Sequence, residues 1–197
     1  MWNERYAGDE YLFGTEPADF LPRVAEWLKP GETVLAIADG EGRNSVWLAA
    51  EGLCVTAFDS APNAIAKARK LAAARGVEVA FHLSDLDGWD WSRDFDVVAG
   101  IFIQFVGPAE RATLFRRIDA ALKPGGLLLL HGYAPRQVGY GTGGPPDPAN
   151  MYTLDLLREA FAGYEVLRAE DFDAEVDEGR GHSGRSALID FVARKPG

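Results

Sequence analysis

A glycine-containing turn between an apolar run and a helical pattern constrains the fold of this chain most. The run Val34–Ala38 is followed by Asp39-Gly40-Glu41-Gly42, and a helical pattern begins at Arg43. A second apolar run then ends on a carboxylate, Asp59. Strand, glycine turn, helix, strand and acid in this order are typical of half of a nucleotide-binding α/β domain. Glycine lets the backbone approach a ligand, the helix start offers N–H groups to an anionic group, and the acid can accept hydrogen bonds from ribose hydroxyls.

The size and charge of the chain narrow its class. It has 197 residues, 47% of them hydrophobic, which is enough for one domain with a sizeable core. The formal net charge of −10 disfavours nucleic acid as a partner, because a phosphate backbone would repel such a chain. Three basic residues, Lys67, Arg69 and Lys70, alternate with alanines on a helical pattern, and we expect them to face solvent.

Cysteine content and hydropathy indicate where in the cell the protein is expected. Cys54 is the single cysteine, so an internal disulfide is excluded, and its place beside a predicted strand makes it an expected small buried hydrophobe. The segment Met1–Tyr6 is too polar for a signal peptide, and no apolar run approaches the ~20 residues that span a bilayer. We therefore expect a cytoplasmic protein with no membrane partner.

Periodicity predicts alternating strands and helices over the first two thirds of the chain. The predicted strands are Thr33–Ala38, Leu53–Phe58, Val77–Leu83, Phe95–Ile103 and Leu127–Leu130, and the predicted helices begin at Pro17, Arg43, Pro62 (with Ser60 as N-cap) and Pro108. This alternation favours a parallel sheet with right-handed crossovers. Lys123–Gly126 is predicted as a tight turn, and Thr153 as the cap of a short helix. Two final strands, Tyr164–Ala169 and Ala187–Ala193, have no helix between them and should pair antiparallel.

Four stretches in this order resemble the motifs of the class I S-adenosylmethionine-dependent methyltransferases. They are the glycine-rich first motif at Leu35–Asn44, the ribose-binding acid at Phe58-Asp59, the adenine-binding segment at Ser84-Asp85-Leu86 and the turn Leu122–Gly126 before the fifth strand. More narrowly, the chain resembles the small bacterial branch related to tellurite-resistance and thiopurine methyltransferases. That likeness rests on Tyr11-x-Phe13-Gly14-x-x-Pro17, Thr142–Pro146 and Glu178–Gly184.

The resemblance implies an α/β fold: a seven-stranded Rossmann-like methyltransferase fold with a mostly parallel sheet, a final antiparallel strand and helices on both faces. It implies one methyltransferase domain over residues 1–197, in which residues 1–30 form an N-terminal cover and helix. The proline- and glycine-rich loop at 135–150 would lie on the substrate side. The chain departs from the family at Ala36, where an acid is usual, and at Ala38, where glycine is usual.

The resemblance also implies the residues of a cofactor site for S-adenosylmethionine, with S-adenosylhomocysteine as the product. The expected cofactor-binding residues are Ala38, Asp39, Gly40, Gly42, Asp59, Ser60, Asp85, Leu86, Gly100 and Ile101. Phe13, Gln104 and Tyr133 are candidates for the substrate side. Gln104 stands where relatives often carry histidine, so no proton acceptor is carried over to that position, and the catalytic residues stay unassigned.

Several residues keep two interpretations. The N-terminal aromatics either pack a helix on the sheet or cover the cofactor and exclude water. Trp89 and Trp91 are expected to anchor their loop rather than to hold adenine. His131 is either a structural histidine or a proton acceptor, and His182 lies in a polar glycine-rich stretch. The three histidines lack paired metal-ligand spacing, so no metal is expected.

The expected reaction is in-line transfer of the methyl group of S-adenosylmethionine to a small-molecule nucleophile, such as a thiol or a metalloid oxyanion. The expected partner is that small molecule, and the protein is expected to be a monomer or a weak dimer. One alternative is an NAD-dependent oxidoreductase, although Ser45 stands where the third glycine of its fingerprint would be. Another is a non-catalytic protein that binds S-adenosylmethionine.

Overall fold

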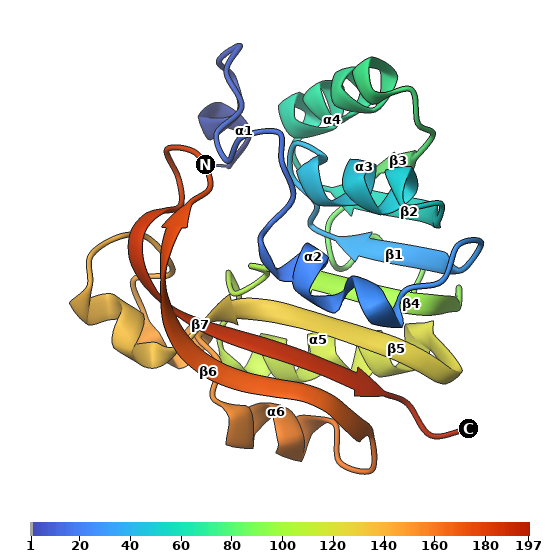
Figure 1. Cartoon of the computed structure of the whole chain (residues 1–197), viewed down its shortest axis with the longest axis vertical. Coiled ribbons are helices and arrows are strands. Elements are labelled where there is room, and N and C mark those ends of the chain that lie inside the picture. Colours follow the sequence, from blue (N-terminus) through green and yellow to red (C-terminus); the bar gives the residue numbers. More distant parts are fainter. Residues whose placement is uncertain (1) are drawn as a thin grey trace. The chain divides into compact units, whose positions relative to one another are not determined.

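The computed structural model describes residues 2–197, and over residues 33–133 the strands alternate with helices, except between the third and the fourth strand (Figure 1). The α-helices and strands are α1 (Trp2–Arg5), α2 (Phe20–Val24), β1 (Thr33–Ile37), α3 (Arg43–Ala50), β2 (Cys54–Asp59), α4 (Pro62–Arg75), β3 (Ala80–Leu83), β4 (Phe95–Ile101), α5 (Pro108–Ala121), β5 (Leu122–Tyr133), α6 (Leu154–Ala160), β6 (Glu165–Asp177) and β7 (Ser183–Arg194). Short 3-10 helices cover Ala25–Trp27, Pro135–Gly139 and Pro148–Asn150.

The strands form one seven-stranded sheet in the order β3-β2-β1-β4-β5-β7-β6. Strand β1 pairs with β2, β2 with β3 and β4 with β5 in parallel, whereas β7 runs antiparallel to both β5 and β6. The predicted fold class, a mostly parallel Rossmann-like sheet with an antiparallel final strand, is confirmed.

Two compact units make up the chain. One comprises the residues up to Trp89 together with Glu178–Gly181, and the other comprises Asp90–Asp177 and His182–Gly197. The assignment of residues 1–197 to one methyltransferase domain, with a cover at 1–30 and a substrate-side loop at 135–150, stays a prediction.

The first unit is built on β1–β3 with α3 and α4. Strands β1 and β2 are buried over almost their whole length, because apolar side chains point to both faces, as in parallel sheets covered by helices. Helix α4 begins at Pro62, a residue suited to the first turn, and ends at Gly76. Gly76 is left-handed and donates its N–H to the carbonyls of Ala72 and Ala73.

The second unit contains β4, α5, β5, α6 and the long hairpin of β6 and β7, shown in orange to red in Figure 1. Both hairpin strands extend well beyond the predicted Tyr164–Ala169 and Ala187–Ala193, so the predicted bounds of these two strands are too short. The burial of β6 alternates between exposed and half-buried residues. It has no continuous apolar run, but over Asp171–Asp177 acidic residues alternate with Phe172, Ala174 and Val176, which is the pattern of a half-buried strand.

Three local predictions also differ from the structure. Lys123–Gly126 belongs to β5, where the pairing with β4 shifts register between Phe95 and Val97, as a bulge does. The N-cap of α4 is Ala61 instead of Ser60, because the carboxylate of Asp59 already accepts the Ala61 N–H. Cys54 is exposed at the start of β2, not buried.

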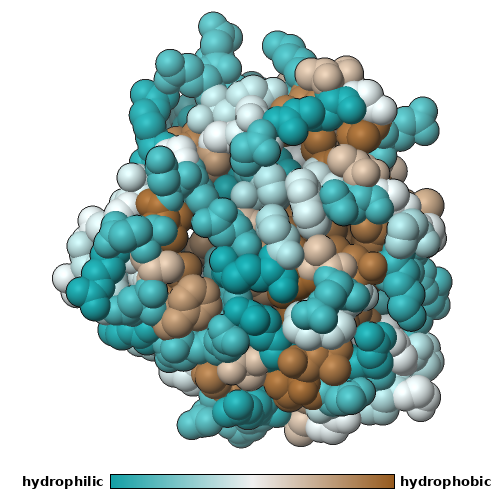
Figure 2. All heavy atoms as spheres, in the orientation of Figure 1, coloured by the Kyte–Doolittle hydropathy of each residue, from teal (hydrophilic) through white to brown (hydrophobic). Residues whose placement is uncertain are grey.

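Hydrophilic residues cover most of the face seen in Figure 2, with hydrophobic residues in smaller groups between them. The large hydrophobic side chains that are exposed come from separate segments: Trp2, Leu83, Phe105, Val138 and Val166. Within residues 2–197, no helix combines the length and the hydropathy that crossing a membrane requires.

Candidate cofactor-binding site

The turn after β1 takes a left-handed course at three of five residues. Ala38 has a φ of 48°, Gly40 of 63° and Gly42 of 89°. A Cβ on Gly42 would lie 2.7 Å from the Cβ of Ala68 on α4, so that position requires glycine. Ala38 adopts its conformation despite a Cβ, and such strain is characteristic of functional turns. The predicted glycine turn is present, with backbone N–H groups following one another around it.

Asp59 ties this turn to the start of α4. One carboxylate oxygen accepts the Gly40 N–H at 2.9 Å, and the other accepts the Ala61 N–H at 2.8 Å. The side chain is buried, and burial raises the pKa of Asp59, while these backbone hydrogen bonds act in the opposite direction. A carboxylate has about four acceptor positions, so two backbone bonds leave capacity for ribose hydroxyls.

Asp39, the second acid of the turn, is half-buried and bound to α3. Its oxygens accept the Ser45 N–H at 3.2 Å and the Ser45 hydroxyl at 2.5 Å. The pKa of Asp39 is raised to about 7, because the effect of burial, with that of the nearby Asp59 carboxylate, outweighs the hydrogen bonds from Ser45 and the charge of Arg43, which lower it. A cationic ligand group beside Asp39 would therefore favour the ionised carboxylate.

The predicted adenine segment follows β3. One oxygen of Asp85 accepts the N–H groups of Asp87 at 3.1 Å and of Gly88 at 2.7 Å, so this carboxylate shapes its own turn. Trp89 is buried and stacks on Phe58 with ring centroids 4.7 Å apart, as expected for a loop anchor. Of the other predicted residues here, Leu86 is half-buried and Ser60 is exposed.

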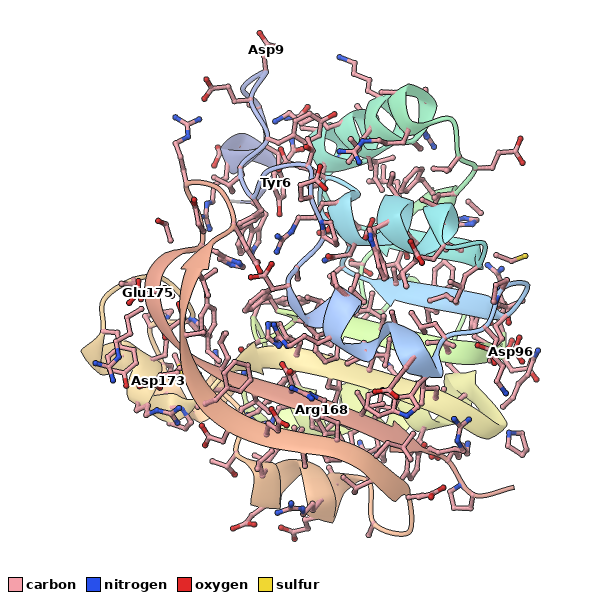
Figure 3. The ribbon with its side chains drawn as sticks, viewed as in Figure 1. Tyr6, Asp9, Asp96, Arg168, Asp173 and Glu175 are labelled. Carbon is pink, nitrogen blue, oxygen red and sulfur yellow. The ribbon has the colours of Figure 1, made fainter. Side chains whose placement is uncertain are left out.

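The N-terminal segment packs on the same unit through aromatic side chains. Tyr6, labelled in Figure 3, is buried against Ala61 and Ala64, with Leu12 and Phe13 beside it. A Cβ on Gly40 would lie 3.1 Å from the Tyr6 hydroxyl, so Tyr6 reaches the glycine turn itself. Burial and the neighbouring acids raise the pKa of Tyr6, which keeps the phenol neutral.

Hydrogen bonds and an ion pair also hold the N-terminal segment on this unit. Glu41 accepts the Leu12 N–H at 2.7 Å and pairs with Lys67 at 2.7 Å, and Lys67 also donates to the carbonyl of Glu10 at 2.7 Å. The side-chain oxygen of Asn44 accepts the Ala18 N–H at 2.9 Å. The expectation that Lys67 faces solvent is therefore wrong, because Glu41 compensates its charge in a buried position.

Arg43 is a residue of this site that sequence reasoning missed. It opens α3, only 6% of its surface is exposed, and one terminal nitrogen donates to Glu178 at 2.8 Å. The other terminal nitrogen, Nη1, is buried and has no hydrogen-bond partner. Its place in sequence, directly after the glycine turn, was the only available signal.

In the second unit, the predicted residues Gly100 and Ile101 end β4, and Phe102 follows with a φ of 57°. A Cβ on Gly100 would lie 2.6 Å from the side chain of Ile103 and 2.9 Å from that of Leu130. Close packing therefore accounts for this glycine, and its part in cofactor binding stays a prediction.

The predicted substrate-side residues of this unit are joined to each other. Gln104 donates to the Tyr133 carbonyl at 2.8 Å and accepts the Tyr133 N–H at 2.6 Å. Its amide is buried and both of its ends are engaged by the backbone. The Tyr133 ring lies 4.9 Å from that of Phe102 and 5.7 Å from that of His182. The substrate-side roles of Gln104 and Tyr133 both stay predictions.

His131 lies at the end of β5 with its imidazole fixed. Its Nδ1 is 2.8 Å from Asp190 and 3.0 Å from the carbonyl of Ile189, so Nδ1 carries a hydrogen. Asp190 in turn accepts from Arg168 at 3.0 Å. These hydrogen bonds are what a structural histidine needs, and they would equally orient the ring of a proton acceptor. Both interpretations of His131 therefore stay open. Within residues 2–197, no three His, Cys, Asp or Glu side chains are grouped as metal ligands would be.

Comparison with known proteins shows which family the region around the Ala38–Gly42 turn is similar to. Residues 34–126 match the family model of a methyltransferase domain. A carboxy-S-adenosyl-L-methionine synthase of Geobacter metallireducens is 39% identical over 79 residues, which are 39% of this chain and 32% of that protein. The chain thus spans about a third of the length of this curated relative.

Solved structures share the fold. One concerns conversion of a disulfide bond into a thioacetal group during echinomycin biosynthesis, with a TM-score of 0.76, 22% identity and coverage of 98% of this chain and 88% of that chain. TehB from Haemophilus influenzae has a TM-score of 0.73, 19% identity and coverage of 98% and 65%. These findings confirm the resemblance to S-adenosylmethionine-dependent methyltransferases. Residues 34–126 thus match the model of a methyltransferase domain, and the chain shares the seven-stranded Rossmann-like fold of solved S-adenosylmethionine-dependent methyltransferases.

Proposed function

We propose that the protein transfers the methyl group of S-adenosylmethionine to a small-molecule nucleophile by in-line displacement. The observation that carries this proposal is the left-handed turn Ala38–Gly42, joined through Asp59 to the end of β2. The turn lets backbone approach a ligand, and the acid lies where a ribose would be held.

The residues present fit the cofactor. Asp59 would bind the ribose hydroxyls, and Asp85 with Leu86 would border the adenine. The amino-acid portion of the cofactor carries an ammonium and a carboxylate, and the turn offers one partner to each. Asp39 is a carboxylate whose pKa burial has raised, and Arg43 has a buried N–H donor without an acceptor. Both features would be relieved by such a ligand.

The cofactor, when bound, supplies an activated methyl group on a sulfonium. The protein has to bind the two reactants, align them and exclude water. The N-terminal aromatic segment serves the last task through Tyr6, which is buried beside the turn. A thiol or metalloid nucleophile needs no strong base, and this agrees with the engaged amide of Gln104.

A sulfur nucleophile is the acceptor class we favour. One structure that shares the fold over nearly this whole chain concerns the conversion of a disulfide bond into a thioacetal group, which is a change at sulfur. The rings of Phe102, Tyr133 and His182 would offer a polarizable, weakly charged surface to such a substrate. The Tyr133 candidate and the loop at 135–150 would line its path.

Calorimetry followed by a transfer assay tests the proposal. The protein should bind S-adenosylmethionine and S-adenosylhomocysteine, and it should not bind NAD. Labelled methyl groups should then appear on a member of a panel of small thiols, selenite and tellurite. Tighter binding of NAD would overturn the cofactor assignment.

A non-catalytic adenosylmethionine-binding protein is the second candidate, because Gln104 offers no proton acceptor to a nucleophile that would need one. Binding of the cofactor without transfer to any acceptor on the panel would support this alternative.

A further inference from the structure

Arg43 is held from three sides within the first unit. Its Nη2 lies 2.8 Å from Glu178, and both side chains are only 7% exposed. The guanidinium carbon lies 5.9 Å from the centre of the Phe13 ring, a cation–π distance. The charge also acts on Asp39, whose pKa it lowers. The side chain is therefore fixed in orientation before any ligand arrives.

The buried Nη1 of Arg43 has no acceptor. A guanidinium has five N–H donors in a rigid fork, and Glu178 engages only part of it. Burying a charged donor without a partner is unfavourable, and native proteins rarely leave one in that state. The unmet donor therefore points to an anionic acceptor that joins the site from outside the chain.

We propose that Arg43 binds the carboxylate of the amino-acid portion of the cofactor, and that Glu178 is a positioning residue for Arg43. This inference rests on the proposed function and assigns one charged end of its ligand. A carboxylate matches the planar guanidinium fork. The ammonium of the same portion would face Asp39, so the two ends of a zwitterion meet opposite charges.

Glu178 is suited to its part because it joins three segments. One oxygen accepts from Arg43, and the other accepts the Asp19 N–H at 3.0 Å. The chain around it is fitted closely to the N-terminal segment. A Cβ on Gly179 would lie 2.7 Å from the Leu12 carbonyl oxygen, and one on Gly181 only 2.1 Å from the Phe13 ring.

These contacts explain the Glu178–Gly184 motif in physical terms. Glycine at 179 and 181 lets the chain press on Leu12 and Phe13, and that approach brings Glu178 to Arg43. The N-terminal segment, through Phe13, and the segment Glu178–Gly181, through Glu178, thereby both contact the guanidinium of Arg43. A purely structural ion pair would make the same contacts, but it would not leave Nη1 without an acceptor.

The test compares two ligands that differ only in this carboxylate. They are S-adenosylhomocysteine and its decarboxylated form, 5′-deoxy-5′-(3-aminopropylthio)adenosine, and calorimetry measures their binding. The native protein should bind the decarboxylated ligand about 10- to 100-fold more weakly, the range of one charge-assisted hydrogen bond. Equal affinities would overturn the proposal without any variant.

Variants then assign the effect to its residues. Arg43→Gln should weaken S-adenosylhomocysteine to the affinity of the decarboxylated ligand and leave the latter unchanged. Glu178→Gln should weaken S-adenosylhomocysteine several-fold, with the same selectivity. Arg75→Gln is the matched control, because the Arg75–Glu16 pair is exposed, and it should change neither affinity.

The outcomes separate this inference from the proposed function. Equal loss for both ligands in Arg43→Gln, or no loss for either, would make Arg43 structural while cofactor binding stands. Failure of the native protein to bind either ligand would overturn the proposed function itself, and the inference with it. If Arg43→Gln does not fold, Arg43→Lys keeps the charge but loses the planar fork, and it should still weaken only S-adenosylhomocysteine.

Discussion

The two units differ in what their buried charged side chains are joined to. In the second unit, His131 is paired with Asp190, and Gln104 bonds to the backbone of Tyr133 at both ends of its amide. In the first unit, the buried polar groups converge on the turn after β1, and Arg43 keeps a donor without an acceptor. Polar groups that satisfy one another stabilise a structure, whereas the Nη1 donor of Arg43 remains available to a ligand.

The satisfied groups of the second unit follow the register of the sheet. His131 on β5 lies directly opposite Asp190 on β7, and Asp190 lies opposite Glu170 on β6. Arg168, labelled in Figure 3, bonds to both acids at 3.0 and 2.7 Å. A shift of either strand by one residue would leave a buried charge unpaired, so this ladder specifies the pairing.

The largest expected effect comes from breaking that ladder. Asp190→Ala should lower the free energy of unfolding by about 3–5 kcal/mol, because it removes one partner of a buried charged pair. Urea unfolding measures the change. Glu170→Ala, at the exposed end of the ladder, is the control and should lose less than about 1 kcal/mol. A similar small loss for Asp190→Ala would mean that the satisfied groups carry no special structural weight.

In the first unit, Asp59→Ala should affect ligand binding and folding together. S-adenosylhomocysteine should bind about a hundredfold more weakly, since a charge-assisted contact to ribose is lost. The free energy of unfolding should fall by about 1–3 kcal/mol, because the Gly40 and Ala61 N–H groups lose their acceptor. Calorimetry and denaturant unfolding measure the two effects. If Asp59→Ala bound S-adenosylhomocysteine as tightly as the native protein, Asp59 would have only a structural role.

The sequence predicted what depends on local pattern. Buried parallel strands are continuous apolar runs, so Val34–Ile37 was found, and the glycine turn with Asp59 follows from the order of neighbouring elements. The partners of charged residues were not predictable in this way. Lys67 appeared to be a solvated residue because nothing near it in the chain indicates Glu41. Arg43 and Glu178 are separated by 135 positions, and only the fold brings them together.

The exposed strands were missed for a different reason. Most of β6 alternates between exposed and half-buried residues, and its polar composition over Asp171–Asp177 resembles that of a loop. The side chains nevertheless carry a strand signature, because Phe172, Ala174 and Val176 alternate with acidic residues and pack inward. Continuous apolar runs therefore reveal the buried strands, whereas this edge strand is recognised only by its period-two alternation.

The pH dependence of stability should reveal the strain at Asp39. Its pKa is raised to about 7 in the folded protein, above the ~3.9 of an unfolded aspartate, so the folded state holds the proton more tightly. This stabilisation is complete below about pH 4 and is lost as the pH rises through 7, at up to about 1.4 kcal/mol per pH unit. Asp39→Asn should remove that component from unfolding curves measured between pH 4 and 8. Parallel curves for the two proteins would contradict the assignment.

The smallest expected effect concerns the left-handed residues, of which each unit has one with a side chain. Ala38 gains nothing from its φ of 48°, and an L-residue in this region costs roughly 1–2 kcal/mol. Ala38→Gly should therefore raise the free energy of unfolding, by about 0.5–1 kcal/mol after the greater entropy of unfolded glycine is counted. Ala36→Gly, in the buried strand β1, should be destabilising and is the control. Phe102, with a φ of 57°, lies with its ring 4.2–4.9 Å from those of His131, Tyr133 and His182, so Phe102→Gly should lose stability through lost packing. If Phe102→Gly raised the free energy of unfolding, or Ala38→Gly lowered it, the prediction would be contradicted. The backbone strain would then lie at Phe102 in the second unit instead of at Ala38 in the first.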